Sequence, residues 1–137
     1  MILNKLQTAI YLELKEAGEP LHGYEILKRI HARGLRFMHQ QLYRDLHRMP
    51  LNSHTEPIQG KPDRILYALP DKSECQINTH KLDVDFLTAY PVPSWIKDKL
   101  TEIDATLTAL SKRPLSFNTQ FKLNITHTER DTLTSIL

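Results

Sequence analysis

Three stretches decide the fold of this chain: LHGYEILKRI (residues 21–30), QQLYRDLHRM (residues 40–49) and GKPDRILYALPD (residues 60–71). The first two place apolar residues at three- and four-residue steps, and each run is closed by a helix-ending residue, Gly34 or Pro50. The third is a Gly-Lys-Pro turn followed by a strand pattern at 64–69, with a weaker strand pattern before it at 51–57. Two short helices followed by a hairpin predict a winged helix-turn-helix head in a mainly α (α+β) fold.

An amphipathic helix is expected before these stretches. Apolar residues over 2–17 recur at mostly three- and four-residue steps. Gly18 is suited to the left-handed geometry of a helix C-terminus, and Pro20 prevents continuation. The segment contains charges and lacks a small-residue cleavage site, so we expect a helix of the mature protein rather than a signal peptide.

Positive charge is concentrated around the second and third helices. Residues 26–48 hold six Lys and Arg residues and one Asp, whereas residues 73–137 hold seven basic and eight acidic residues. Such a local excess is typical of a surface that binds phosphates, although a solvated helix face has the same composition.

The outer face of helix 39–49 has the side chains that read bases. Arginine can donate two hydrogen bonds to guanine, and glutamine can make two with adenine, in a major groove that admits a helix. We therefore expect Gln40, Gln41 and Arg44 to contact bases, and Arg48, one turn on, to contact a phosphate. For Tyr43 the alternative is core packing against the preceding helix. The full candidate DNA-binding set is Arg29, Arg36, His39, Gln40, Gln41, Tyr43, Arg44, His47, Arg48, Lys61 and Arg64.

The three stretches together resemble the PadR family of bacterial transcriptional regulators. The resemblance lies in residues 3–71 and is carried by Leu21–Ile26, Leu42–Met49 and Gly60–Pro70. It implies a dimeric winged-helix regulator of the repressor type, with Tyr43 and the Lys61 wing tip at the DNA backbone. Arg44 stands where members of that family usually have proline.

The second half of the chain is expected to pair two such heads. Residues 94–112, with Ser94 as the expected N-cap, carry a narrow apolar seam at steps of four, three, four and three. A partner helix in a second copy is expected, because winged-helix repressors bind paired half-sites; a partner helix in the same chain is the alternative. The candidate dimer-interface residues are Trp95, Ile96, Leu100, Ile103, Leu107 and Leu110.

These patterns predict three regions: a DNA-binding head (1–72), a helical dimerisation region (73–113) and a C-terminal tail (114–137). In the tail, Phe117, Phe121, Leu123 and Ile125 share one parity, which predicts a short strand, followed by a short helix from Thr128. Between head and dimer helix, Phe86, Tyr90 and Trp95 are candidates for lining a small-molecule effector pocket, and plain core packing is the alternative.

No enzymatic motif is present: there is no phosphate-binding glycine loop, nucleophile elbow or helical pair of metal-ligand histidines. We therefore expect no catalytic activity, no cofactor and no metal. The single Cys75 and the absence of a long apolar run favour a cytoplasmic protein without a membrane span. Sequence-specific regulation of transcription through double-stranded DNA is the expected function. The alternative is a winged-helix adaptor or inhibitor, from a mobile element, that binds another protein.

Overall fold

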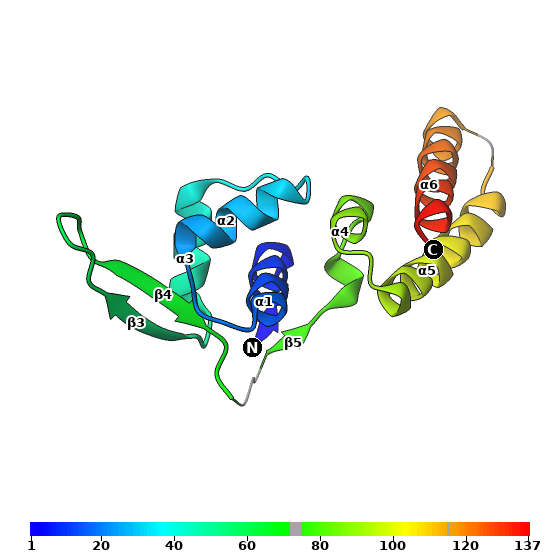
Figure 1. The fold of residues 1–137 in the computed structure, drawn as a ribbon. Helices are drawn as coiled ribbons and strands as arrows, with labels where there is room; N and C mark the ends of the chain where they lie inside the picture. Colours follow the sequence, from blue (N-terminus) through cyan, green and yellow to red (C-terminus); the bar gives the residue numbers. More distant parts are fainter. Residues whose placement is uncertain (72–74, 115) are drawn as a thin grey trace. The chain divides into compact units, whose positions relative to one another are not determined.

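The computed structural model describes residues 1–71, 75–114 and 116–137, which form two compact units, Met1–Asn78 and Thr79–Leu137 (Figure 1). The predicted boundary between residues 72 and 73 lies outside the described residues. The second unit contains residues of both the predicted dimerisation region and the predicted tail.

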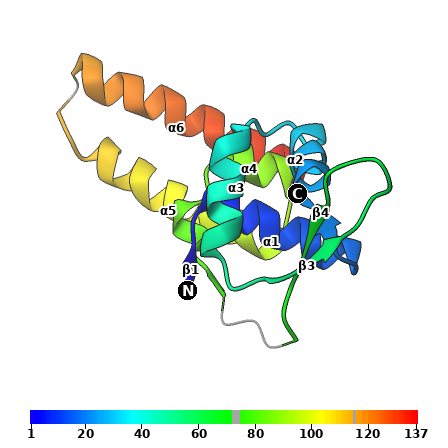
Figure 2. The same ribbon diagram turned by 90° about the vertical axis from the view of Figure 1, so that its left-hand side faces the viewer.

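The first unit contains three helices and a three-stranded sheet. The helices are α1 (Lys5–Ala17), α2 (Gly23–Ala32) and α3 (His39–Arg48). The strands β2 (Leu21–His22), β3 (Asn52–Glu56) and β4 (Arg64–Ala68) form an antiparallel sheet in the order β2-β4-β3. Figures 1 and 2 show β3 and β4 as a hairpin that extends beyond the helices. This is a winged helix-turn-helix, and the predicted fold of the head is confirmed.

The start of the chain differs from the prediction. Ile2–Leu3 is a short strand, β1, which pairs in parallel with β5 (Gln76–Ile77) instead of extending the first helix. The physical reason is a capping box: the Asn4 side chain accepts a hydrogen bond from the Gln7 amide, and Gln7 Oε1 accepts one from the Asn4 amide. Helix α1 therefore begins at Lys5.

Two smaller boundaries also differ. The Leu21-His22 pair, at the start of the 21–30 stretch, is strand β2 and pairs with Tyr67 and Leu66. Helix α2 ends at Ala32, two residues before Gly34. Gly34 has a positive φ and lies in the loop after the helix. Strand β2 thus places the sheet directly against the start of α2.

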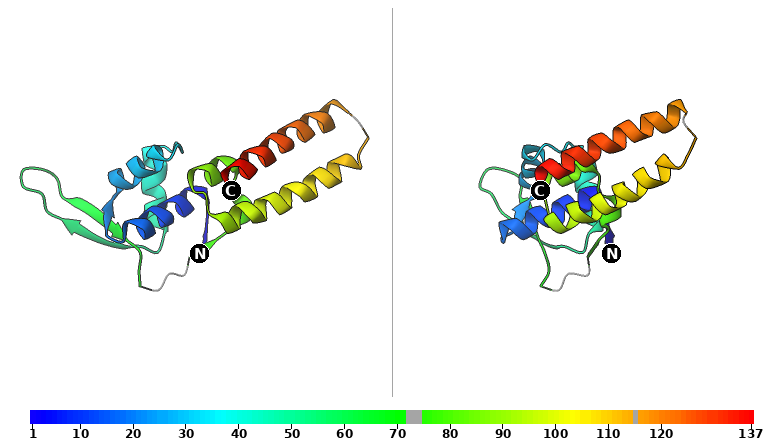
Figure 3. Two further views of the ribbon diagram at one scale, coloured as in Figure 1. Left: turned by 45° about the vertical axis from the view of Figure 1, so that its right-hand side comes forward. Right: turned by 90° about the vertical axis from the view of Figure 1, so that its right-hand side faces the viewer.

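The second unit contains the 3-10 helix η1 (Thr79–Lys81) and helices α4 (Val84–Ala89), α5 (Pro93–Ser111) and α6 (Phe117–Ile136). Helices α5 and α6 lie side by side as an antiparallel hairpin (Figure 3). The predicted N-cap of α5, Ser94, is wrong: Val92 is the cap and Pro93 occupies the first helical position, where its missing amide hydrogen costs nothing.

The predicted tail strand is wrong. Residues 117–136 form one helix, and Thr128, expected to begin a last turn, lies in its middle. Phe117, Phe121 and Ile125 follow one another at steps of four residues. In a strand such an even step keeps side chains on one side of the sheet, and in a helix a step of four keeps them on one face. Ser116 favours the helix, because its hydroxyl oxygen accepts a hydrogen bond from the Thr119 amide and caps the N-terminus of α6.

The apolar seam of α5 has a partner in its own chain. Ile96, Ile103 and Leu110 are buried, and α5 packs against α6. Trp95, Leu100 and Leu107 are half-buried. The intrachain partner that the sequence left as an alternative is therefore present.

The aromatic residues proposed for an effector pocket include two that pack together. Phe86 and Tyr90 are buried, and their rings stack with centroids 4.9 Å apart. This arrangement is the core packing expected of large aromatic side chains. An effector site at this point stays a prediction.

Candidate nucleic-acid interface

Helix α3 has a buried face and an exposed face that divide its residues by chemistry. Leu42 and Leu46 are buried, and Met49 follows them into the core. The buried Asp45 carboxylate accepts a hydrogen bond of 3.3 Å from Gln7 Nε2 of α1. These contacts hold α3 against the body of the head, so that its opposite face points to solvent.

The exposed face of α3 presents most of the predicted DNA-contacting residues. Gln40, Gln41 and Arg44 are exposed on its first half, and His47 and Arg48 on its second. His39 is exposed at the first position. Arg36, in the loop before α3, is exposed as well. One helix thus brings donors and acceptors suited to base edges together with cations suited to phosphates.

Tyr43 lies at the junction of three elements. A Cβ atom built on Gly23 would be 2.6 Å from the Tyr43 Cζ and Oη atoms, so the ring lies directly over the first residue of α2. On its own helix it contacts His39, with ring centroids 4.5 Å apart. Burial, and secondly the nearby Tyr43, raise the pKa of the Tyr67 phenol on β4. Tyr43 is half-buried, so the packing role left open by the sequence is present, with part of the side chain still accessible.

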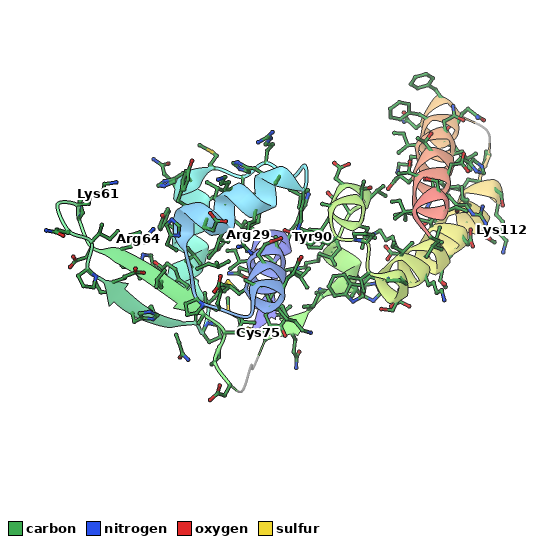
Figure 4. All side chains as sticks on the ribbon, in the orientation of Figure 1. Arg29, Lys61, Arg64, Cys75, Tyr90 and Lys112 are labelled. Carbon is green, nitrogen blue, oxygen red and sulfur yellow. The ribbon has the colours of Figure 1, made fainter. Side chains whose placement is uncertain are left out.

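The wing carries its cations at and behind its tip. Lys61 is exposed in the turn next to Gly60, whose φ of 75° lies in the left-handed region. Arg64 begins β4 opposite Glu56 of β3, and their side chains form an ion pair of 3.5 Å. Figure 4 shows Lys61 at the tip and Arg64 nearer to the body of the head.

Acidic partners reduce the positive charge that the sequence alone suggests. Arg29 Nε donates to Glu25 Oε1 at 3.0 Å, and this hydrogen bond holds the pKa of Glu25 below its ordinary value. Arg33 pairs with Glu13 and Glu16 of α1. In the described part of the chain, by contrast, Arg36, Arg44, Arg48 and Lys61 form no ion pair within 4.0 Å. Among the predicted DNA-contacting residues, these four cations are the ones most available to phosphates or bases.

Sequence reasoning missed two features of this chain. One is the close contact of Gly23 with Tyr43, for which the sequence contains only a glycine at the start of a helix. The other is an exposed apolar stripe of Phe117, Phe121 and Ile125 on α6, which the assignment of a strand concealed. The four-residue spacing was the available signal for the second.

Neither metal ligation nor membrane insertion has support in the described residues. No group of three or more His, Cys, Asp and Glu side chains among them could hold a metal ion. None of their helices is both long and apolar enough to cross a bilayer.

Among known proteins, the similarity of this chain lies with solved structures. No family model matches the chain, and no curated protein matches it. The chain is similar to Bacillus subtilis PadR, solved in complex with operator DNA, with 22% sequence identity and a TM-score of 0.42. The alignment covers 96% of this chain and 97% of the other. The winged helix-turn-helix fold of the head is established by helices α1, α2 and α3 and by the strand order β2-β4-β3.

Proposed function

We propose that this chain is a sequence-specific DNA-binding transcriptional regulator that acts as a homodimeric repressor and not as an enzyme. The observation that carries the proposal is the exposed face of α3, where Gln40, Gln41 and Arg44 precede His47 and Arg48. A helix fits the major groove, and its N-terminal half reaches deepest into it. Helix α3 is thus the recognition helix, and Lys61 of the wing contacts the backbone.

The division of roles along α3 follows from position. Gln40, Gln41 and Arg44 discriminate between base pairs, because each can form a two-point hydrogen bond with one base edge. Arg48, Arg36, Lys61, Arg29 and Arg64 supply affinity by neutralising phosphates, a contribution that falls steeply as salt rises. In a repressor, occupancy of the operator alone blocks transcription, and the compact head needs no further chemistry.

The test is a titration of the full chain onto fluorescent duplexes, after selection of preferred sites from a random pool. At about 50 and about 200 mM salt, we expect preference for the selected duplex and weaker binding at the higher concentration. Absence of binding at both concentrations, from folded protein, would contradict the proposal and favour the protein-binding adaptor, for which the exposed stripe on α6 is the supporting observation.

Two matched arginine variants separate discrimination from affinity. Arg44→Ala is expected to lose about 1–3 kcal/mol on the selected duplex and little on random DNA. Arg48→Ala, one turn along the same exposed face, is expected to weaken both duplexes alike and to lower the salt slope by about one. If Arg44→Ala lost the same binding free energy on both duplexes, Arg44 would not be a residue that discriminates between bases.

A further inference from the structure

A buried polar contact ties the recognition helix α3 to the first helix of the chain. Asp45 on the inner face of α3 and Gln7 of α1 are each 4% exposed. Gln7 Nε2 donates a hydrogen bond of 3.3 Å to Asp45 Oδ1, although the two residues are 38 positions apart. Asp45 forms no ion pair within 4.0 Å in the part of the chain that the structure describes. The carboxylate is therefore buried against a neutral amide rather than a cation.

Such a contact is a poor source of stability. A buried carboxylate loses its hydration, and a hydrogen bond to a neutral amide offsets only part of that free energy. The inner face of α3 is otherwise apolar, with Leu42 and Leu46 fully buried. Apolar residues in place of Gln7 and Asp45 would fill the same space without the cost of burying a charge. The pair therefore calls for a role other than holding the fold together.

The hydrogen bond has a direction, which the apolar packing of α3 lacks. Hydrophobic burial is non-directional, so Leu42 and Leu46 hold α3 against the head but tolerate small rotations about its axis. A hydrogen bond weakens when its donor and acceptor lose alignment, so the Asp45 contact resists such rotations. Asp45 directly follows Arg44 and lies one turn after Gln41 on the same helix. Any rotation of α3 that moves the Asp45 carboxylate therefore moves both of these base-reading side chains.

Gln7 is itself held in one orientation by the N-terminal cap of α1. The Asn4 amide donates to Gln7 Oε1 at 3.1 Å, and the Gln7 amide donates to Asn4 Oδ1 at 2.8 Å. Because the side-chain oxygen of Gln7 accepts from Asn4, the side-chain nitrogen is left to face α3. Asn4 directly follows β1, which is fixed by its pairing with β5. The donor is thus oriented independently of α3, as a supporting contact requires.

We propose that Gln7 and Asp45 are positioning residues that set the rotation of the recognition helix, and through it the discrimination between base pairs. Side chains that bind a target have to be held within about 0.5 Å and about 10–20° of their productive geometry by supporting hydrogen bonds. The buried pair touches no base; it aligns Gln41 and Arg44 with the base edges that they read. This inference rests on the proposed function, because it concerns the specificity of the same helix.

The test replaces the polar pair by an apolar pair, Gln7→Met with Asp45→Ala, in the full chain. Dissociation constants are measured on the selected and random duplexes, and urea denaturation followed by circular dichroism measures stability. We expect a folded double variant whose preference for the selected duplex falls roughly tenfold, the size of one weakened base contact. A loss of folded protein weakens binding to both duplexes alike, so the ratio of the two constants reports positioning rather than stability.

Asp45→Asn is the matched control, because its side-chain oxygen can still accept from Gln7 Nε2 in the same space. This variant is expected to keep the wild-type preference. Gln7→Met alone leaves the buried carboxylate without its donor, so it should unfold at a lower urea concentration than the double variant. If the first apolar pair does not fold, Gln7→Met with Asp45→Leu takes its place.

A folded apolar pair with the wild-type preference would overturn the proposal and leave the contact a structural one. Failure of both apolar pairs to fold would overturn it as well, because the contact would then be needed for the fold itself. Loss of preference in Asp45→Asn would show that charge rather than alignment matters. A wild type without preference for any duplex contradicts the proposed function and this inference together, whereas the first three outcomes contradict only this inference.

Discussion

Gly23 is the residue whose role is most sharply defined by packing. The glycine does not serve backbone freedom, because the positive-φ glycines of the described chain are Gly18, Gly34 and Gly60. Glycine is needed at this position because the Tyr43 ring occupies the volume where the Cβ atom of any other residue would lie. The contact joins the first residue of α2 to the recognition helix, so a change at Gly23 is transmitted to α3.

We predict that Gly23→Ala lowers the free energy of unfolding by about 1–3 kcal/mol, the usual cost of overpacking. Adding Tyr43→Leu, which removes the ring, should recover part of that loss, so the two changes are non-additive. Urea denaturation of the single and double variants measures this coupling. Additive effects would mean that the methyl group is accommodated without displacing Tyr43.

Glu25 is the second residue with a predicted effect, because it neutralises a candidate phosphate ligand. Its ion pair with Arg29 and its lowered pKa keep it ionised at neutral pH. Glu25→Gln should therefore strengthen binding to random duplex severalfold and make the salt slope steeper by about one. Glu16→Gln is the control, because Glu16 pairs with Arg33, which is outside the proposed interface. Unchanged binding by Glu25→Gln would place Arg29 away from the DNA.

At the scale of elements, helix α6 shows how one spacing can suit two structures. Its inner face carries Thr126 and Leu133, which are seven residues apart and are both buried. This face packs toward the rest of the unit. Its exposed stripe is formed by Phe117, Phe121 and Ile125, and the spacing of these residues had predicted a strand. The hydroxyl of Ser116 then supplies the local signal for the helix start.

We predict that Ser116→Ala lowers the free energy of unfolding by about 1 kcal/mol, the cost of a lost N-cap. Thr134→Ala is the control, because Thr134 is exposed within the same helix and its hydroxyl donates a hydrogen bond to the Arg130 carbonyl. That change should stay within about 0.5 kcal/mol of wild type. Denaturation followed by circular dichroism measures both, and equal stability of the two variants would argue against a cap at Ser116.

At the scale of the whole molecule, the proposed dimer constrains the operator. Two heads related by a two-fold axis require two half-sites in inverted orientation, with their centres about one helical turn, or a multiple of it, apart. A change in half-site spacing therefore changes the face of the duplex on which the second half-site lies.

We predict that inserting about 5 base pairs between the half-sites weakens binding far more than inserting about 10, because only the longer insertion restores the original face of the DNA. Gel-shift titration of the full chain with the three duplexes measures this. Equal binding of wild type to all three duplexes would contradict paired recognition.

The sequence by itself determined the order of the head: apolar steps of three and four marked α2 and α3, and the Gly-Lys-Pro turn marked the wing. These are local signals, since helix periodicity and turn chemistry depend on neighbours a few residues away. It also indicated which face of α3 is polar, and hence the candidate Gln40, Gln41 and Arg44 set.

Only the tertiary structure decided which charges and apolar faces remain available. Arg33 and its partners Glu13 and Glu16 are far apart in the chain. The seam of α5 is covered by a single helix where the sequence suggested a short strand and a short helix. Such contacts depend on how elements meet rather than on any local pattern. For the same reason the stripe of Phe117, Phe121 and Ile125 became a candidate interface only when α6 was seen to turn it outward.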